Sequence, residues 1–168
     1  MTGGTARAAS VASSWEPLLT DLSRSPLTPV LIVGPGAREI ARRLHDMTHA
    51  GARAPFVHVD CTWLPAEETG RLLFGFEDNG RIKRGSVERA SGGTLFLDDV
   101  AELPAADQAR LAKMLDSMRF RRHRGLHEIV VAIRVVAAVR DDVSLALKSG
   151  RLRRDLHARL SVFPIVTS

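Results

Sequence analysis

The segment that most constrains the fold is Gly92-Gly93-Thr94-Leu95-Phe96-Leu97-Asp98-Asp99. Its residues 94–97 suit a strand, and no polar position alternates among them. Such a run predicts a strand that is buried on both faces, as in the middle of a parallel sheet. The carboxylates of Asp98 and Asp99 would then lie at the C-terminal edge of the sheet, where open α/β folds bind ligands.

Paired acids at that edge suit Mg²⁺ and polarised water, as in phosphoryl-transfer enzymes. The other interpretation is a buried strand that ends in a solvated Asp-Asp turn. From these residues alone, both interpretations stay open.

The rest of the chain alternates between apolar runs and helical periods. Further strands are predicted over residues 30–33, 56–59, 133–139 and 162–165. Helices are predicted over residues 39–49, 65–74, 86–90, 104–118, 143–148 and 151–160, with another that begins after an N-cap at Ser14. This β-α alternation predicts a three-layer α/β/α sandwich with a five-stranded parallel sheet. We expect a loose tail over residues 1–13, one domain over residues 14–168, an exposed loop at 75–85 and a basic connection at 119–125.

Composition narrows the class of protein. The 168 residues suffice for one domain with a real core, and the formal net charge is +5, mostly from Arg. Cys61 is the only cysteine, so no intrachain disulfide can form and a reducing compartment fits. No apolar run approaches the length of a membrane span, so we expect a soluble cytoplasmic protein.

The order of these segments resembles the AAA+ core of bacterial sigma-54-dependent transcription activators, the enhancer-binding proteins. The matching segments are VLIVG (30–34), PFVHVDC (55–61), LFG (73–75), GGTLFLDD (92–99), AELP (101–104), RVVAA (134–138) and GRLRRDLHARLSVFPI (150–165). The resemblance implies a P-loop NTPase fold of the AAA+ type and, in the family, binding of ATP and Mg²⁺.

The phosphate-binding loop departs from the family. Gly34, Gly36 and Arg38 stand where the family has the Walker A stretch GESGTGKE, but the loop is shorter and has no lysine. Pro35 also removes a backbone donor. Losing three charged hydrogen bonds of about 1.5–3 kcal/mol each would weaken nucleotide binding roughly a thousandfold or more. Arg38 could still attract an anion at a helix N-terminus; the other interpretation is a turn without a ligand.

Acidic residues near the expected site also differ from those of the family. The resemblance gives Asp98 the role of holding Mg²⁺, whereas Asp99 replaces a longer catalytic Glu. An error of about 1 Å in placing a catalytic group can cost on the order of a hundredfold in rate. Asp60 replaces an Asn that contacts that Glu, and Arg140 replaces a sensor Asn, so neither can make the family's hydrogen bonds.

The resemblance also bears on the residues that contact partner proteins in the family. Arg153 and Arg159 match the family's arginine fingers, although they could simply pair with Asp155 or solvent. The GAFTGA loop that touches sigma-54 is missing between residues 75 and 92, so a sigma-54 contact is not expected. The family's helical lid and DNA-binding domain are not expected within residues 1–168.

A short basic run adds another alternative. Arg119, Arg121, Arg122 and Arg124 flank Phe120 and His123, a composition that can bind phosphates and stack on bases. A solvated loop is the other interpretation. No His or Cys residues have the spacing of a metal site, and Cys61 is expected to be a buried structural residue.

Together these features predict a degenerate AAA+ domain that does not hydrolyse ATP and needs no cofactor. It would act in transcription regulation by protein–protein interaction, docking on AAA+ relatives or on itself through the flank with Arg153 and Arg159. Two other functions stay open. One is a slow ATPase that uses Arg38, Asp98 and Asp99 with ATP and Mg²⁺, and the other is a nucleic-acid-binding module that uses residues 119–124.

Overall fold

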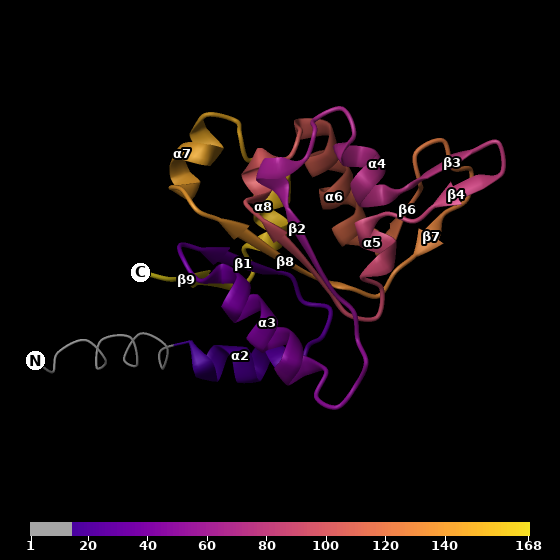
Figure 1. Ribbon diagram of the computed structural model, residues 1–168. Helices are drawn as coiled ribbons and strands as arrows, with labels where there is room; N and C mark the ends of the chain where they lie inside the picture. The colour runs from indigo at the N-terminus through magenta and orange to yellow at the C-terminus, as the bar shows by residue number, and fades with distance from the viewer. Residues whose placement is uncertain (1–14) are drawn as a thin grey trace, which may run out of the picture.

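A five-stranded parallel sheet forms the centre of the molecule (Figure 1). The structure, a computed structural model, describes residues 15–168, so the predicted tail and the Ser14 cap lie outside the described residues. The strands are β1 (Val30–Val33), β2 (Phe56–Asp60), β5 (Thr94–Asp98), β8 (Arg134–Val139) and β9 (Pro164–Val166), in the order β2-β5-β8-β1-β9. The predicted parallel sheet is thus confirmed.

Side-chain alternation divides the core between the two faces of this sheet. Leu95 and Leu97 of β5 belong to the apolar cluster on one face, and Phe96 belongs to the cluster on the other. All three side chains are fully buried, because β5 lies between β2 and β8 and helices cover both faces. Burial on both faces explains the uninterrupted apolar run of this strand in the sequence.

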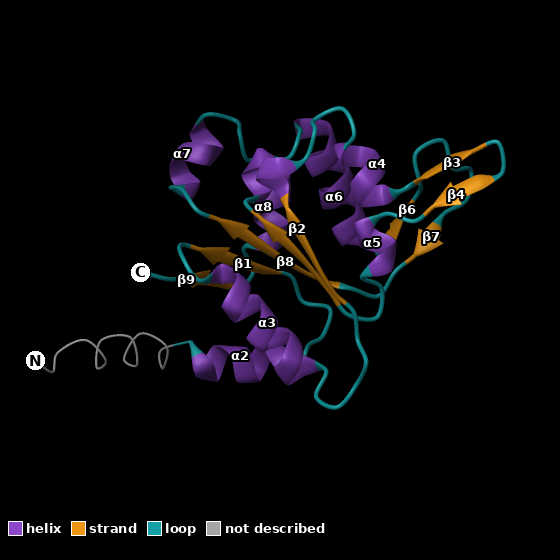
Figure 2. Ribbon diagram, in the orientation of Figure 1, coloured by secondary structure: helices purple, strands orange, loops and turns teal. Residues whose placement is uncertain are grey.

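Helices complete the three layers (Figure 2). One face is covered by α2 (Glu16–Ser23) and α3 (Ala37–Thr48). The other face is covered by α4 (Thr69–Phe74), α5 (Ser86–Arg89), α6 (Ala105–Ser117) and α8 (Arg154–Leu160). The helix α7 (Val143–Lys148) follows β8, and the short 3₁₀ turns η1 (Cys61–Trp63) and η2 (Val100–Glu102) follow β2 and β5. The helices α4 and α8 begin three or four residues later than predicted.

The prediction of an exposed loop over residues 75–85 is wrong. This segment is an antiparallel hairpin of β3 (Phe76–Asp78) and β4 (Arg81–Lys83). Asn79 and Gly80 connect the strands with φ angles of 47° and 80°, the left-handed pair that a tight hairpin turn requires. Asn-Gly is the sequence signal of such a turn, and it went unused in the prediction.

The prediction of a basic connection over residues 119–125 is also partly wrong. Its first two residues form β6 (Arg119–Phe120), which pairs with β7 (Ile129–Val130). The backbone of His123 then pairs with the other hairpin, because its N–H donates to Gly75 O at 2.9 Å and its C=O accepts from Glu77 N at 3.0 Å. We call residues 75–85 and 119–130 together the hairpin lobe.

None of the helices between residues 15 and 168 is long and apolar enough to cross a membrane.

Candidate functional site

Acidic residues end two neighbouring strands at the C-terminal edge of the sheet, where Asp98 and Asp99 were expected. The parallel register of β2 and β5 places Asp60 directly opposite Asp98, the last residue of each strand. Asp99 follows at the start of η2. Neighbouring strands of a parallel sheet end at the same edge, so pairing alone brings these residues together.

The carboxylate of Asp98 is paired with an arginine of its own chain. Arg140 follows β8, the next strand in the sheet, and its Nη2 donates to Asp98 Oδ2 at 3.0 Å. The same oxygen lies 3.8 Å from His58 Nε2. The hydrogen bond to Asp98 raises the pKa of Arg140, which keeps the guanidinium charged. A positive group therefore lies on one of the two carboxylate oxygens of Asp98.

The carboxyl of Asp99 is buried, and the backbone at Asp99 is strained. Its backbone is left-handed with φ 60°, only 7% of the residue is exposed, and Oδ1 has no hydrogen-bond partner among the described residues. Burial raises the pKa of Asp99, and the nearby Glu102 raises it further. Burial therefore favours the protonated form of this carboxyl group.

The carboxylate of Asp60 accepts hydrogen bonds from the nearby Thr62. Its Oδ1 accepts from the N–H of Thr62 at 3.0 Å and from the Thr62 hydroxyl at 2.6 Å. These hydrogen bonds, above all the one from the Thr62 side chain, lower the pKa of Asp60. Asp60 thus caps η1. The adjacent Cys61 is buried, which raises the pKa of its thiol and leaves it inert, as expected of a structural cysteine.

The turn that stands in place of Walker A is short and packed. Gly34, Pro35 and Gly36 alone separate β1 from α3. The Thr167 hydroxyl donates to Pro35 O at 2.7 Å, and Thr167 N donates to Val33 O at 2.8 Å. A Cβ on Gly34, whose φ is 109°, would lie 2.5 Å from the Thr167 carbonyl oxygen. Neighbouring backbone therefore fills the inner side of this turn.

Arg38 is not brought to the acids. It lies in the first turn of α3 and lines a hollow on the outer surface of that helix, with Glu39, Arg42, Arg43, Asp46 and Met47. All of these residues belong to α3, and the carboxylates at the sheet edge line none of it. Arg38 and the carboxylates at the sheet edge therefore do not line a common hollow.

Arg153 and Arg159 each pair with a carboxylate of their own chain. Arg153 makes two 2.9 Å hydrogen bonds to Asp155, and Arg159 makes bonds of 2.7 and 2.6 Å to Asp116 on α6. These bonds lower the pKa of both carboxyls. Both arginines remain about one-third exposed or more, so a partner could still reach them.

The basic run is likewise engaged within the chain. Arg122 bonds to Glu77 at 2.6 Å and to Glu88 at 2.7 and 3.0 Å, and only 12% of its side chain is exposed. Arg119 and Arg124 lie within 3.6 and 3.7 Å of Glu128 and Asp78. Three of the four arginines in this run therefore form ion pairs within the chain, and Arg121 is exposed.

Sequence reasoning missed two features of the site, the contact of Arg140 and His58 with Asp98 and the packing of Thr167 on the turn. The first could have been found, because β5 and β8 were both predicted as buried strands. A basic residue directly after one strand lies beside an acid that ends its neighbour.

The chain matches known proteins along almost its full length. The model of the sigma-54 interaction domain matches residues 12–166. The phenol regulator MopR of Acinetobacter guillouiae is 38% identical over 138 residues, which cover 79% of this chain and 24% of MopR. The nitrogen assimilation regulatory protein NtrX of Azorhizobium caulinodans is 36% identical over 140 residues, 81% of this chain and 31% of that protein.

The fold agrees with this family. The crystal structure of NtrX from Brucella abortus in complex with ADP superposes with a TM-score of 0.83 at 29% identity, over 99% of this chain and 37% of that one. The chain thus spans about a quarter to a third of the length of these relatives. Together with the parallel sheet and its edge of acids, the match shows that the chain belongs to the sigma-54 interaction domains, the AAA+ domains of sigma-54-dependent activators.

Proposed function

We propose that this AAA+ domain serves transcription regulation through protein–protein interaction and does not hydrolyse ATP. The observation that carries the proposal is the 3.0 Å ion pair between Arg140 and Asp98. The family resemblance assigns Asp98 to Mg²⁺, and the guanidinium would have to leave before a second cation could approach. Such a regulator would work in the cytoplasm of a bacterium.

Two further features support loss of catalysis. The Asp99 carboxyl, at the position of the family's water-activating Glu, is buried without a full set of hydrogen bonds. The Gly34–Gly36 turn offers few free N–H groups, because Pro35 has none and Gly34 N donates to Val139 O at 3.2 Å. A triphosphate therefore lacks both its backbone cradle and its lysine.

The test is an ATPase assay on three proteins: the wild-type chain, Asp98→Asn and Arg140→Asn. We expect the wild type to release phosphate at the rate of Asp98→Asn, which serves as the blank. Arg140→Asn restores the family residue and should also stay at the blank rate, because the Walker A lysine remains missing. Turnover of the wild type above Asp98→Asn would contradict the proposal.

A slow ATP-binding domain is the second candidate. It is favoured by the structures of NtrX from Brucella abortus in complexes with ADP and with ATP, which share this fold with TM-scores of 0.83 and 0.81. Under this alternative Arg38, Asp98 and Asp99 would have to move together around the nucleotide. Protection of the Asp98 region from hydrogen exchange by ATP and Mg²⁺ would favour it.

For the protein partner, we propose a second AAA+ domain, of a relative or of the same chain, docked on the flank with Arg153 and Arg159. Surface ion pairs such as Arg159–Asp116 contribute at most about 1 kcal/mol, so an intermolecular carboxylate can replace Asp116 at little cost. Light scattering should detect association that Arg153→Ala/Arg159→Ala abolishes. The matched control is Arg24→Ala/Arg53→Ala, two exposed arginines with no ion pair among the described residues. Equal loss in both variants would exclude this flank.

A further inference from the structure

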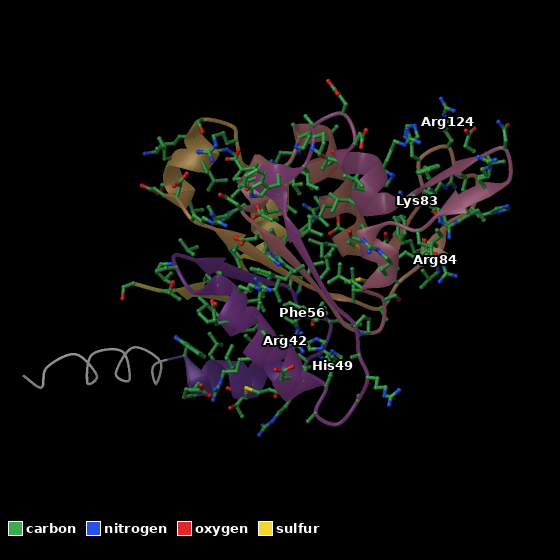
Figure 3. The ribbon with its side chains drawn as sticks, in the orientation of Figure 1. Arg42, His49, Phe56, Lys83, Arg84 and Arg124 are labelled. Carbon is green, nitrogen blue, oxygen red and sulfur yellow. The ribbon has the colours of Figure 1, made fainter. Side chains whose placement is uncertain are left out.

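The hairpin lobe carries most of the excess positive charge of the chain. Its residues 75–85 and 119–130 hold seven Arg or Lys and three Asp or Glu, an excess of four, while the whole chain has a formal charge of +5. Lys83, Arg84 and Arg124 lie at this end of the molecule, away from α2 and α3 (Figure 3). A charge concentrated in this way attracts a polyanion.

Four cations converge on one hollow between the hairpin lobe, α4 and α5. The hollow measures about 600 Å³ and is lined by Glu68, Arg71, Leu72, Phe76, Lys83, Arg84 and Arg89. Glu68 is its only carboxylate. Within residues 15–168, Arg71, Lys83 and Arg89 form no ion pair, and Arg84, which is 73% exposed, lies 3.3 Å from Glu88. The lining of the hollow therefore carries an excess of positive charge, with four cationic side chains and one carboxylate.

One of these cations is held over an aromatic ring. The Cζ of Arg71 lies 4.3 Å from the centroid of the Phe76 ring. The ring thus restrains the guanidinium at the wall of the hollow. A planar group held in this way can stack on a nucleobase through its other face.

We propose that the hollow and the adjoining face of β4 bind single-stranded nucleic acid. Phosphates would lie on Lys83, Arg84 and Arg89, and a base would stack on the Arg71–Phe76 pair. A strand carries one charge per nucleotide, so it can neutralise several of these cations at once, which one free phosphate cannot. The planar platform favours a base-bearing polymer over an acidic peptide. This site differs from the nucleotide site at Asp98 and does not depend on whether ATP binds.

The experiment measures fluorescence anisotropy of a labelled 20-nucleotide DNA strand titrated with the 168-residue chain, without ATP, over a series of salt concentrations. We expect Lys83→Ala/Arg84→Ala to weaken binding about tenfold or more. It should also flatten the plot of log affinity against log salt by about 1.4, because two phosphate contacts are lost. Arg71→Lys keeps the positive charge but removes the planar guanidinium on which a base would stack. It should therefore weaken binding with little change in the slope of log affinity against log salt.

The matched control is Arg24→Ala/Arg53→Ala, which removes two charges from the connections after α2 and α3. Thermal unfolding of each variant should stay within a few degrees of the wild type, since all these side chains are exposed or lie at the surface. The proposal stands if only Lys83→Ala/Arg84→Ala and Arg71→Lys lose affinity.

Three results would overturn it. One is no binding of the strand even at low salt, and another is an equal loss of affinity in the control variant, which would indicate bulk charge. The third is a polyglutamate peptide that competes as well as an unlabelled strand of equal charge, which would assign the hollow to an acidic protein.

Discussion

Arg134 is the largest of the fully buried side chains between residues 15 and 168. Its Nη2 donates to the carbonyls of Leu22 and Ser25 at 2.6 and 2.5 Å, and its Nη1 donates to the Thr48 hydroxyl at 2.9 Å. Burial lowers the pKa of Arg134 to about 10, so the side chain stays charged at neutral pH. Arg134 thus joins the C-terminal ends of α2 and α3 to the sheet, where a cation also suits the helix dipoles.

Arg134→Ala should lower the free energy of unfolding by about 3 kcal/mol or more, because it leaves a cavity and removes three charged hydrogen bonds. Urea denaturation measures this loss. Arg53→Ala, an exposed arginine, should change stability by less than about 0.5 kcal/mol. Similar losses in the two variants would show that Arg134 does not hold the helices.

Two histidines at the C-terminal end of α3, His45 and His49, predict that stability depends on pH. Burial, the chief cause, lowers the pKa of His45 and of His49 below the ordinary 6.5, with neighbouring Arg42 and Arg134 acting in the same direction. Asp46 alone among the nearby charges opposes the shift at His45. The folded state therefore binds fewer protons than the unfolded state below about pH 6.5, and stability should fall on acidification.

Denaturation at pH 7.5 and 5.5 checks this. The wild type should lose stability between the two, and His45→Gln/His49→Gln should lose less, because it has no imidazole to protonate. Asp99, whose pKa is raised by burial, acts in the opposite direction at lower pH, and both proteins retain it. An identical loss in both proteins would assign the pH dependence to other groups.

At the scale of elements, the hairpin lobe depends on one arginine. Arg122 bridges Glu77 of β3 and Glu88 of α5, and its side chain is mostly buried. These bonds raise the pKa of Arg122, so the bridge stays charged. Within the lobe, Phe120 and Ile129 join the apolar core, whereas residues 75–85 contribute none of its members, so the network helps to hold that hairpin in place.

Arg122→Ala should destabilise the lobe by about 3 kcal/mol, because it leaves two carboxylates without their partner in a partly buried site. The neighbouring Arg121→Ala is the matched control, since Arg121 is exposed. Hydrogen exchange should speed up for backbone amides of residues 75–85 in the first variant only. Unchanged exchange in that variant would contradict the role of the bridge.

Elements differed in how well the sequence predicted them. The strand at residues 94–98 was predictable because its burial on both faces leaves a continuous apolar run. The strands β6 and β7 are two residues long and partly exposed, so their sequence lacks any period. The Asn79-Gly80 turn was readable in principle. The ion pair at Asp98 requires β5 and β8 to be neighbours in the sheet, which their succession as two predicted strands suggests.

For the whole molecule, the proposed function implies a conserved scaffold with altered chemistry. The sandwich and the order of its strands are those of the family, and the segments that match it are mainly those that form the core. The departures gather at the C-terminal edge of the sheet, in the Gly34–Gly36 turn, Asp99 and Arg140. The central claim is that this edge no longer binds nucleotide tightly.

Calorimetric titration of ATP with Mg²⁺ into the 168-residue chain tests that claim most directly, with the AAA+ domain of NtrX from Brucella abortus as the positive control. The account predicts no saturable heat below millimolar ATP, and the same trace for Asp98→Asn. Micromolar binding by the wild-type chain that Asp98→Asn abolishes would contradict it.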